Sequence, residues 1–177
     1  MSQTEVTPAV ANDTKPGAKE QEEDPLSKIT PAQLSLITET WAIASVDLQA
    51  AGLVMFKKLF EIAPELIEIF PFDGEDLNDD NVSLRKHSMQ VMQSINDALG
   101  MADQPEELKE TLIGLGVVHN MSNVQLESFA PVGQALIYAL GDVCKDKFTF
   151  EARTAWVALY TAVQHYMTLG MIEGLDA

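Results

Sequence analysis

Apolar residues between about positions 30 and 170 recur every three or four residues, and no stretch of useful length alternates with a period of two. This spacing is typical of helices that bury one face, whereas half-buried strands alternate residue by residue. Thr30-Pro31-Ala32-Gln33 places an N-cap, a first-position proline and a capping-box glutamine in succession, so the first helix is predicted to begin there. The sequence therefore predicts an all-α domain of seven or eight helices.

The further helices are placed by their apolar faces and by proline, glycine and capping residues at their ends. Asp103-x-x-Glu106, with Pro105 between them, has the pattern of a second helix start. Pro131 falls inside a predicted helix, where a proline should bend the helix or delay its start. After the helix that begins at Thr30, helices are expected over about 47–62, 64–70, 82–100, 103–119, 125–144 and 150–170, with a longer loop over 71–81.

A length of 177 residues fits one domain with a tail better than two domains. Residues 1–28 are rich in Thr, Pro, Lys, Glu and Asp and show no apolar periodicity, so they are predicted to form a disordered acidic tail. The folded domain is predicted over 29–172, and a short C-terminal tail over 173–177.

The formal net charge of −16 arises from 27 acidic and 11 basic residues. It argues against nucleic acid as a partner, because phosphate binding needs clustered Lys and Arg, and against docking on an anionic membrane. No apolar run approaches the roughly 20 residues of a membrane span, and no signal-peptide pattern is visible. The single cysteine, Cys144, cannot form an intrachain disulfide. We therefore expect a cytoplasmic protein that neither binds nucleic acid nor inserts into a membrane.

Two of the three histidines lie on apolar helix faces. His87 follows Leu84 by three residues and precedes Val91 by four, which places it on the inward face of the 82–100 helix. On the next predicted helix, His119 continues the stripe formed by Leu108, Leu112 and Leu115. An imidazole in such a setting needs hydrogen-bond partners for its nitrogens, or a metal for one of them.

Spacing alone leaves two interpretations of these histidines open. Each can be an ordinary core residue that is bonded to a backbone carbonyl. Alternatively both bind a metal. Two imidazoles are too few for a closed tetrahedral zinc site, but an iron held by four porphyrin nitrogens needs only one or two axial ligands.

Four sequence stretches resemble globins, in the order in which globins carry them. The region before His119 resembles the globin segment with the proximal histidine, and His87 with Val91 matches the distal pair. A third stretch is similar to the segment that ends in a haem-contacting phenylalanine, and a fourth is closer to neuroglobins than to myoglobins or haemoglobins. The proximal stretch is Leu112-Ile-Gly-Leu115-Gly-Val-Val-His119, followed by Phe129, Val132 and Gly133. The stretch that ends in the phenylalanine is Val54-Met-Phe56-Lys-Lys-Leu59-Phe60-x3-Pro64-x5-Phe70, and the neuroglobin-like stretch is Phe148-Thr-x3-Arg153-x2-Trp156-x3-Tyr160.

This resemblance covers about residues 30–170 and implies a globin fold whose helices pack around a haem b pocket. It implies that His119 is the proximal iron ligand, with its other N–H bonded to a nearby acceptor, and that His87 faces the iron from the opposite side. Gln90 stands where a basic residue near a haem propionate is expected. The implied haem-binding residues besides the two histidines are Phe56, Phe70, Phe72, Gln90, Val91, Leu115, Val124, Phe129 and Val132.

Two roles remain open for His87. It can hydrogen-bond a gas held at the iron, as in oxygen-storing globins, or it can ligate the iron itself and give a six-coordinate, bis-histidyl haem. The neuroglobin-like resemblance favours direct ligation, in which a gas must compete with an internal ligand.

The resemblance implies reversible binding of O2, NO and CO, with a sensing, NO-scavenging or redox role. A five-coordinate globin for O2 storage or transport is the alternative, and a haem-free globin-like sensor or scaffold is a third candidate. No Gly-rich phosphate loop, Ser/His/Asp set or carboxylate pair indicates a dedicated enzyme. Any NO dioxygenase or nitrite reductase activity is expected to need an external electron-donor protein, because the sequence shows no pattern of a reductase domain.

Overall fold

A computed structural model describes residues 23–72 and 74–173. Within these ranges the protein consists of six α-helices and five short 3-10 segments, and it contains no strand. The all-α prediction is confirmed, whereas the predicted number of helices is too high because the expected helix at 64–70 is a 3-10 segment, Pro64–Ile69. The α-helices are α1 Pro31–Ala44, α2 Leu48–Ile62, α3 Val82–Gly100, α4 Pro105–Met121, α5 Phe129–Cys144 and α6 Phe150–Glu173.

Helix α1 begins with the predicted capping box. The Gln33 backbone N–H donates to Thr30 Oγ1 at 3.2 Å, and the Thr30 N–H donates to Gln33 Oε1 at 2.9 Å. These two bonds satisfy N–H groups that have no partner within the helix. Helix α3 has the predicted bounds, and the Asn81 side chain caps it by accepting from the Leu84 N–H at 2.8 Å.

The starts of α4 and α5 differ from the sequence prediction. Gln104, not Asp103, is the N-cap of α4, and no side chain caps this end. Pro105, with its preset φ, and two glutamates in the first turn favour the helix start instead. Helix α5 begins at Phe129, so Pro131 lies in its first turn. Backbone N–H groups in the first turn of a helix have no acceptor within that helix, so the missing N–H of Pro131 costs no hydrogen bond there. This explains why α5 begins later than predicted.

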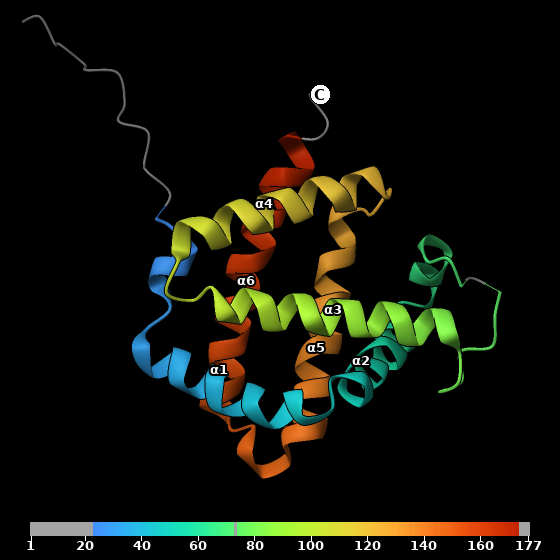
Figure 1. Ribbon diagram of the computed structural model, residues 1–177, viewed down its shortest axis with the longest axis horizontal. Coiled ribbons are helices and arrows are strands. Elements are labelled where there is room, and N and C mark those ends of the chain that lie inside the picture. The colour runs from blue at the N-terminus through green and yellow to red at the C-terminus, as the bar shows by residue number, and fades with distance from the viewer. Residues whose placement is uncertain (1–22, 73, 174–177) are drawn as a thin grey trace, which may run out of the picture.

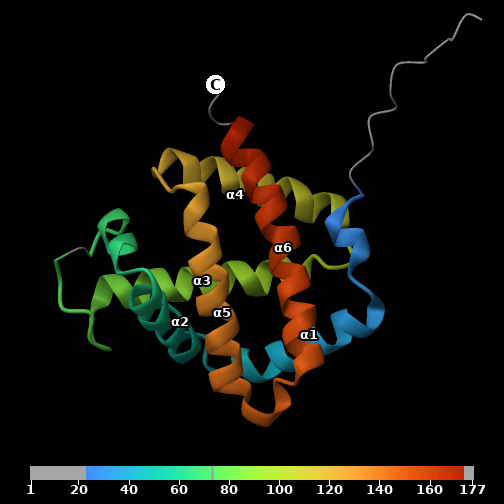
Figure 2. The ribbon, with the colours of Figure 1, turned by 180° about the vertical axis from the view of Figure 1, so that it is seen from behind.

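Helices α3 and α4 cross α5 and α6 steeply, with α1 and α2 at the opposite end of the molecule from α4 (Figure 1). The view from behind shows α5 and α6 as neighbours that pass in front of α3 and α4 (Figure 2). Helix α4 packs on α6, and α2 packs on both α3 and α5. None of the helices in the described ranges is long and apolar enough to cross a membrane.

The crossing of α4 and α6 brings their backbones into contact at two glycines. A Cβ atom at Gly116 on α4 would collide with the backbone carbonyl of Met167 on α6. A Cβ atom at Gly170 on α6 would collide with the backbone carbonyl of Ile113 on α4. Only glycine permits so close an approach, so these two positions set the depth at which the helix carrying His119 is seated.

Residues 23–28 were predicted to belong to a disordered tail, but they are part of the folded structure. Residues 1–22 of the predicted N-terminal tail and residues 174–177 of the predicted C-terminal tail lie outside the described residues. Pro25–Lys28 forms a 3-10 turn that Asp24 caps. Asp24 also pairs with Lys109 on α4, with Nζ and Oδ2 2.7 Å apart, and accepts a hydrogen bond of 2.6 Å from the Tyr166 hydroxyl on α6. We term Asp24, Lys109 and Tyr166 the clasp, and residues 24–29 the strap.

Burial by itself would raise the pKa of Asp24. The hydrogen bonds from Lys109, Tyr166 and the Leu26 N–H outweigh this effect and lower the pKa to about 2, from an ordinary value of 3.8. The carboxylate therefore stays charged in the folded protein through most of the acidic range.

We predict that Gly116→Ala lowers the free energy of unfolding by about 1–3 kcal/mol, because the added methyl group forces α4 away from α6. Gly114→Ala is the matched control on the same helix, since nothing lies within 4 Å of a Cβ there. It should raise stability by about 0.5–1 kcal/mol through a better helix propensity. Urea unfolding measures both changes, and equal stability of the two variants would contradict the close crossing.

We predict that Asp24→Asn is less stable than the wild type at neutral pH by about 1 kcal/mol. Because the pKa of Asp24 is lower in the folded state than in the unfolded chain, its contribution is present above about pH 4 and lost as the pH falls towards about 2. Unfolding curves of the two proteins should therefore converge in that window. Asp142→Asn, which breaks an exposed ion pair with Lys145, is the control and should show almost no difference at any pH. A constant gap down to pH 2 would be evidence against the clasp.

Candidate functional site

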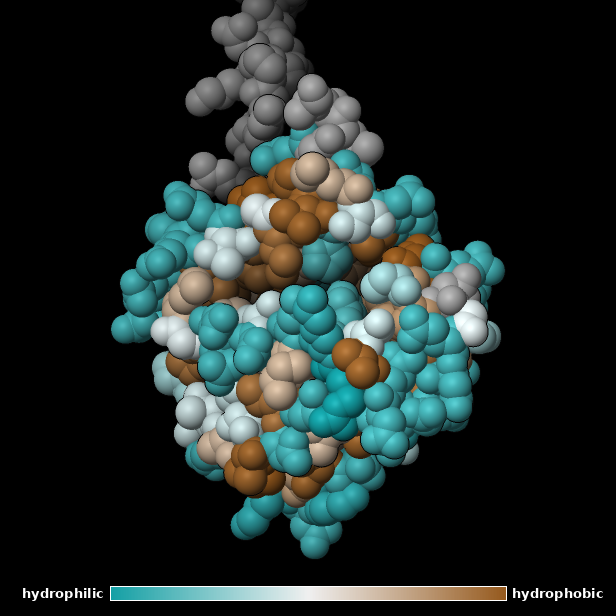
Figure 3. All heavy atoms as spheres, turned by 45° about the vertical axis from the view of Figure 1, so that its right-hand side comes forward, coloured by the Kyte–Doolittle hydropathy of each residue, from teal (hydrophilic) through white to brown (hydrophobic). Residues whose placement is uncertain are grey.

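A cavity of about 930 Å³ lies in the middle of the helical domain, and every one of the six α-helices contributes to its walls. Its size lies in the range of about 300–1,000 Å³ that is usual for small-molecule and cofactor sites. Most lining residues are apolar, and both His87 and His119 are among them. On the face of the molecule shown in Figure 3, a hollow bordered by hydrophobic residues opens in the upper half, within a mostly hydrophilic surface.

His87 enters the cavity from α3 and is surrounded by aromatic rings. Its ring centroid lies 5.3 Å from that of Phe56 and 5.1 Å from that of Phe70, both with the rings nearly perpendicular. Among the described residues, neither ring nitrogen of His87 has a hydrogen-bond partner. The side chain is thus held by shape, while its nitrogens are left free to bind something else.

Burial lowers the pKa of His87, and the charge of a protonated His119 lowers it further. The second effect reflects the fact that both imidazoles line one cavity with few polar groups between them. A lowered pKa keeps the His87 imidazole neutral at physiological pH, so that a nitrogen lone pair is available to a metal.

His119 enters the cavity from α4 with one of its nitrogens already occupied. Its Nδ1 lies 2.9 Å from the backbone carbonyl of Leu115, one turn earlier on the same helix. Because a carbonyl can only accept, Nδ1 carries the hydrogen and Nε2 keeps its lone pair. The ring also lies parallel to that of Phe129, with the centroids 6.5 Å apart and the planes at 27°. This tautomer and orientation are those expected of a metal ligand with a bonded outer nitrogen.

The structure brings together nearly all of the residues that the sequence assigned to the site. Phe72 is the exception: it is fully buried, stacks on Phe70 with centroids 5.2 Å apart, and does not line the cavity. Aromatic identity and a position two residues after Phe70 did not distinguish a residue of the cavity wall from one that packs behind the wall. The predicted residues on the cavity wall are Phe56, Phe70, His87, Gln90, Val91, Leu115, His119, Val124, Phe129 and Val132.

Sequence reasoning missed the residues that line the part of the cavity away from the two histidines. Leu108 and Leu112 belong to the same apolar stripe as His119, and that spacing could have identified them. Tyr160 lines the cavity from α6, and its hydroxyl donates to the Phe129 carbonyl at 2.6 Å. Burial raises the pKa of Tyr160, so this hydroxyl remains a donor. No local pattern predicts such a contact between two helices.

The geometry agrees with what comparison with known proteins shows. The family model for globins matches residues 53–167. The chain belongs to the globin family. Neuroglobin-1 of Oncorhynchus mykiss is 30% identical over 149 residues, which cover 82% of this chain and 94% of that protein. Neuroglobin of Chaenocephalus aceratus is 31% identical, with the same coverage of both chains.

Solved structures share the globin fold at lower identity. A hexacoordinated haem protein from an anhydrobiotic tardigrade has a TM-score of 0.78 at 20% identity, covering 84% of this globin and 99% of that chain. A hexa-coordinate haemoglobin of Drosophila melanogaster has a TM-score of 0.73 at 20% identity, covering 78% and 93%. Membership in the globin family implies haem as the cofactor and small gases as ligands.

The residues of this globin fit a haem. Within the ranges that the structure describes, no three His, Cys, Asp or Glu residues are grouped so that they could hold a metal ion by themselves. The cavity instead offers two imidazoles and apolar walls, a donor set that suits a metal carried in a macrocycle of its own. Phe70 and Phe129 supply flat aromatic rings next to His87 and His119, respectively.

Proposed function

We propose that this chain binds haem b and, through its iron, reversibly binds O2, NO and CO, with His119 as the proximal ligand and His87 as a competing distal ligand. The observation that carries the proposal is that one apolar cavity is lined by both imidazoles, each with an available nitrogen. The iron supplies the site at which small gases coordinate. Every further property that we propose depends on how the side chains hold and shield that site.

The two histidines differ in how firmly they are held, and this difference supports their distinct roles. His119 has its Nδ1 bound to the Leu115 carbonyl and therefore has one orientation in which Nε2 points away from its helix. His87 packs against the rings of Phe56 and Phe70 and has no hydrogen bond to another described residue. An imidazole held by packing alone can turn away at a smaller cost, which is what a displaceable ligand requires.

The cavity wall next to His87 is largely apolar. Phe56, Phe70 and Val91 surround His87, and none of these side chains can hydrogen-bond a ligand. His87 is therefore the polar side chain best placed to meet a gas within this aromatic part of the pocket. Gln90, three residues along α3, is exposed at the edge of the cavity and carries no charge to pair with a haem propionate.

A five-coordinate globin for O2 storage or transport is the second candidate. It uses the same cavity, but His87 then donates a hydrogen bond to the gas instead of binding the iron. The similarity in fold to two hexacoordinate haem proteins favours the six-coordinate form. We further propose a sensing, NO-scavenging or redox role, with an external electron donor. The free, buried thiol of Cys144 agrees with a reducing compartment such as the cytoplasm.

We predict that the haem-reconstituted wild-type protein, when ferrous and free of oxygen, shows the sharp, split visible bands of a six-coordinate iron. His87→Leu should show one broad band, and its CO affinity should rise on the order of tenfold because no internal ligand competes. Visible absorption spectra and CO titration measure both effects. His165→Gln is the control, because His165 lies on α6, outside the cavity, against Tyr166.

The spectrum of His165→Gln should be the same as that of the wild type. A broad ferrous band in both the wild type and His87→Leu would favour the five-coordinate alternative. Failure to develop a Soret band after incubation with haem would overturn the proposal as a whole.

We also predict that the two histidines are unequal in retaining the cofactor. His119→Ala should lose haem to an acceptor apoprotein far faster than His87→Ala, because it removes the ligand that the Leu115 carbonyl orients. Added imidazole should slow the loss from His119→Ala by taking the vacated place. Equal loss rates for the two variants would show that neither histidine is the dominant ligand.

A further inference from the structure

The cavity extends well beyond the two histidines. Leu108 lines it three helical turns before His119, about 16 Å along α4. Leu99 lines it more than three turns after His87, about 18 Å along α3. The end of α3 and the start of α4 meet at one corner of the molecule (Figure 1), and Leu99 and Leu108 lie near these two helix ends. A macrocycle held by the two imidazoles would occupy the part of the cavity around them, and the stretch towards Leu99 and Leu108 would lie beyond it.

We term this part the outer arm. Its walls combine leucines of α3 and α4 with residues of α6, and Leu108, Leu112 and Met167 are buried in one apolar cluster. An apolar space of this kind stays free of ordered water and readily takes up small uncharged molecules. The outer arm is lined by Ala98, Leu99, Leu108, Leu112, Val163 and Met167.

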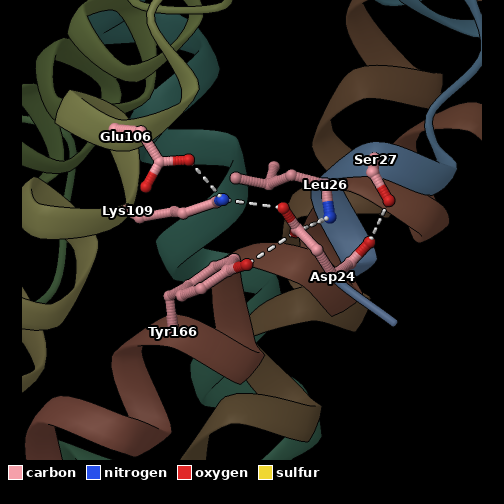
Figure 4. Close-up of polar contacts among 6 residues, drawn as sticks. All are labelled: Asp24, Leu26, Ser27, Glu106, Lys109 and Tyr166. Carbon is pink, nitrogen blue, oxygen red and sulfur yellow. Dashed lines mark hydrogen bonds and ion pairs between the residues drawn. The ribbon is translucent and has the colours of Figure 1, made fainter. Parts of the chain in front are cut away.

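The strap closes the outer arm at the end remote from His87. Asp24, Leu26 and Ile29 of the strap line the cavity, opposite Pro105 and Lys109 at the start of α4. Figure 4 shows the Asp24 carboxylate between the Lys109 ammonium and the Tyr166 hydroxyl, at the distances of 2.7 Å and 2.6 Å given above. The charged groups of the cavity wall are thus gathered at this end, where they join the strap to α4 and α6.

Besides the clasp, two partly buried apolar side chains hold the strap. Leu26 packs against the apolar cluster of the outer arm and Ile29 packs against the main core, whereas no residue of the 3-10 turn Pro25–Lys28 is fully buried. Segments with few buried contacts open at a much lower free energy than the core does. Because the rest of the turn is not buried, the ion pair and the hydrogen bond of the clasp contribute substantially to keeping this end of the cavity closed.

We propose that the strap is a gate: when the clasp opens, small uncharged ligands such as CO and O2 enter through the outer arm by a route that does not pass His87. This inference rests on the proposed haem function, because the destination of the ligand is the iron between the histidines. It assigns Asp24 a role in ligand entry although the residue lies far from both imidazoles. The clasp then sets the entry rate independently of the competition by His87.

The test is the bimolecular recombination of CO after laser photolysis of the reconstituted ferrous protein. Asp24→Ala removes both clasp contacts and should raise the recombination rate roughly fivefold, the population change expected when such a pair is lost. Glu106→Gln is the matched control: Glu106 Oε1 also pairs with Lys109, at 2.8 Å, but it does not touch the strap. Its rate should equal that of the wild type.

A double variant tests the route. Ala98 lines the outer arm, so Asp24→Ala with Ala98→Leu places a larger side chain in the path and should return the rate towards the wild-type value. An Asp24→Ala rate equal to that of Glu106→Gln, or a double variant as fast as Asp24→Ala, would overturn the gate.

Amide hydrogen exchange separates a failure of the gate from a failure of the proposed function. The Leu26 N–H, which donates to Asp24 Oδ1 at 2.9 Å, should exchange faster in Asp24→Ala than in Glu106→Gln, with or without haem. If the chain takes up no haem, the proposed function fails, and the rate at which xenon exchanges into the cavity, followed at the Leu112 and Met167 methyl resonances, then tests entry by itself. Unchanged amide exchange, or xenon exchange rates that are equal in the two variants, would contradict the gate in that case.

Discussion

The fold depends on keeping an apolar cavity open in the middle of a small helical domain. The apolar side chains that line this space of about 930 Å³ lack packing partners on one side, and a bound molecule would supply them. The backbone contact of α4 with α6 at Gly116 and Gly170 is the rigid element from which one wall of this cavity is built. The size of the cavity and its two imidazoles therefore support the same conclusion about the occupant.

The chemistry of the site follows from an asymmetry between the two histidines. Leu115 provides a carbonyl one turn before His119, so the helix itself sets the tautomer and the direction of that imidazole. His87 has no such partner among the described residues and is placed by the edges of Phe56 and Phe70. A ligand fixed by a hydrogen bond and a ligand confined only by packing differ in the cost of displacement. Because His87 is the more easily displaced of the two imidazoles, a gas would compete with His87 and not with His119.

The strap joins the periphery of the fold to its interior. Asp24 is charged and partly exposed, yet it lines the same cavity as the histidines because the cavity extends to the corner where α3 ends and α4 begins. Lys109 and Tyr166 hold it from two different helices, so the strap is held to the pair α4 and α6 as a unit. The predicted tail boundary at residue 28 was wrong for this reason: a stretch without apolar periodicity can be ordered by one carboxylate when two helices offer partners for it.

The sequence by itself determined the all-α class, the bounds of α3, the capping box of α1 and the inward direction of His87 and His119, because each of these depends on residues within a few turns of one another. It did not determine that Phe72 packs behind Phe70 and away from the cavity, or that α4 begins without a side-chain cap. Nor did it show the contact of Tyr160 with the Phe129 carbonyl, or the clasp that orders residues 24–29. The contact of Tyr160 and the clasp join residues that are distant along the chain, and the direction of Phe72 depends on what packs around it. Only the tertiary structure decided them, because the angle and depth at which two helices cross depend on the packing of all their neighbours.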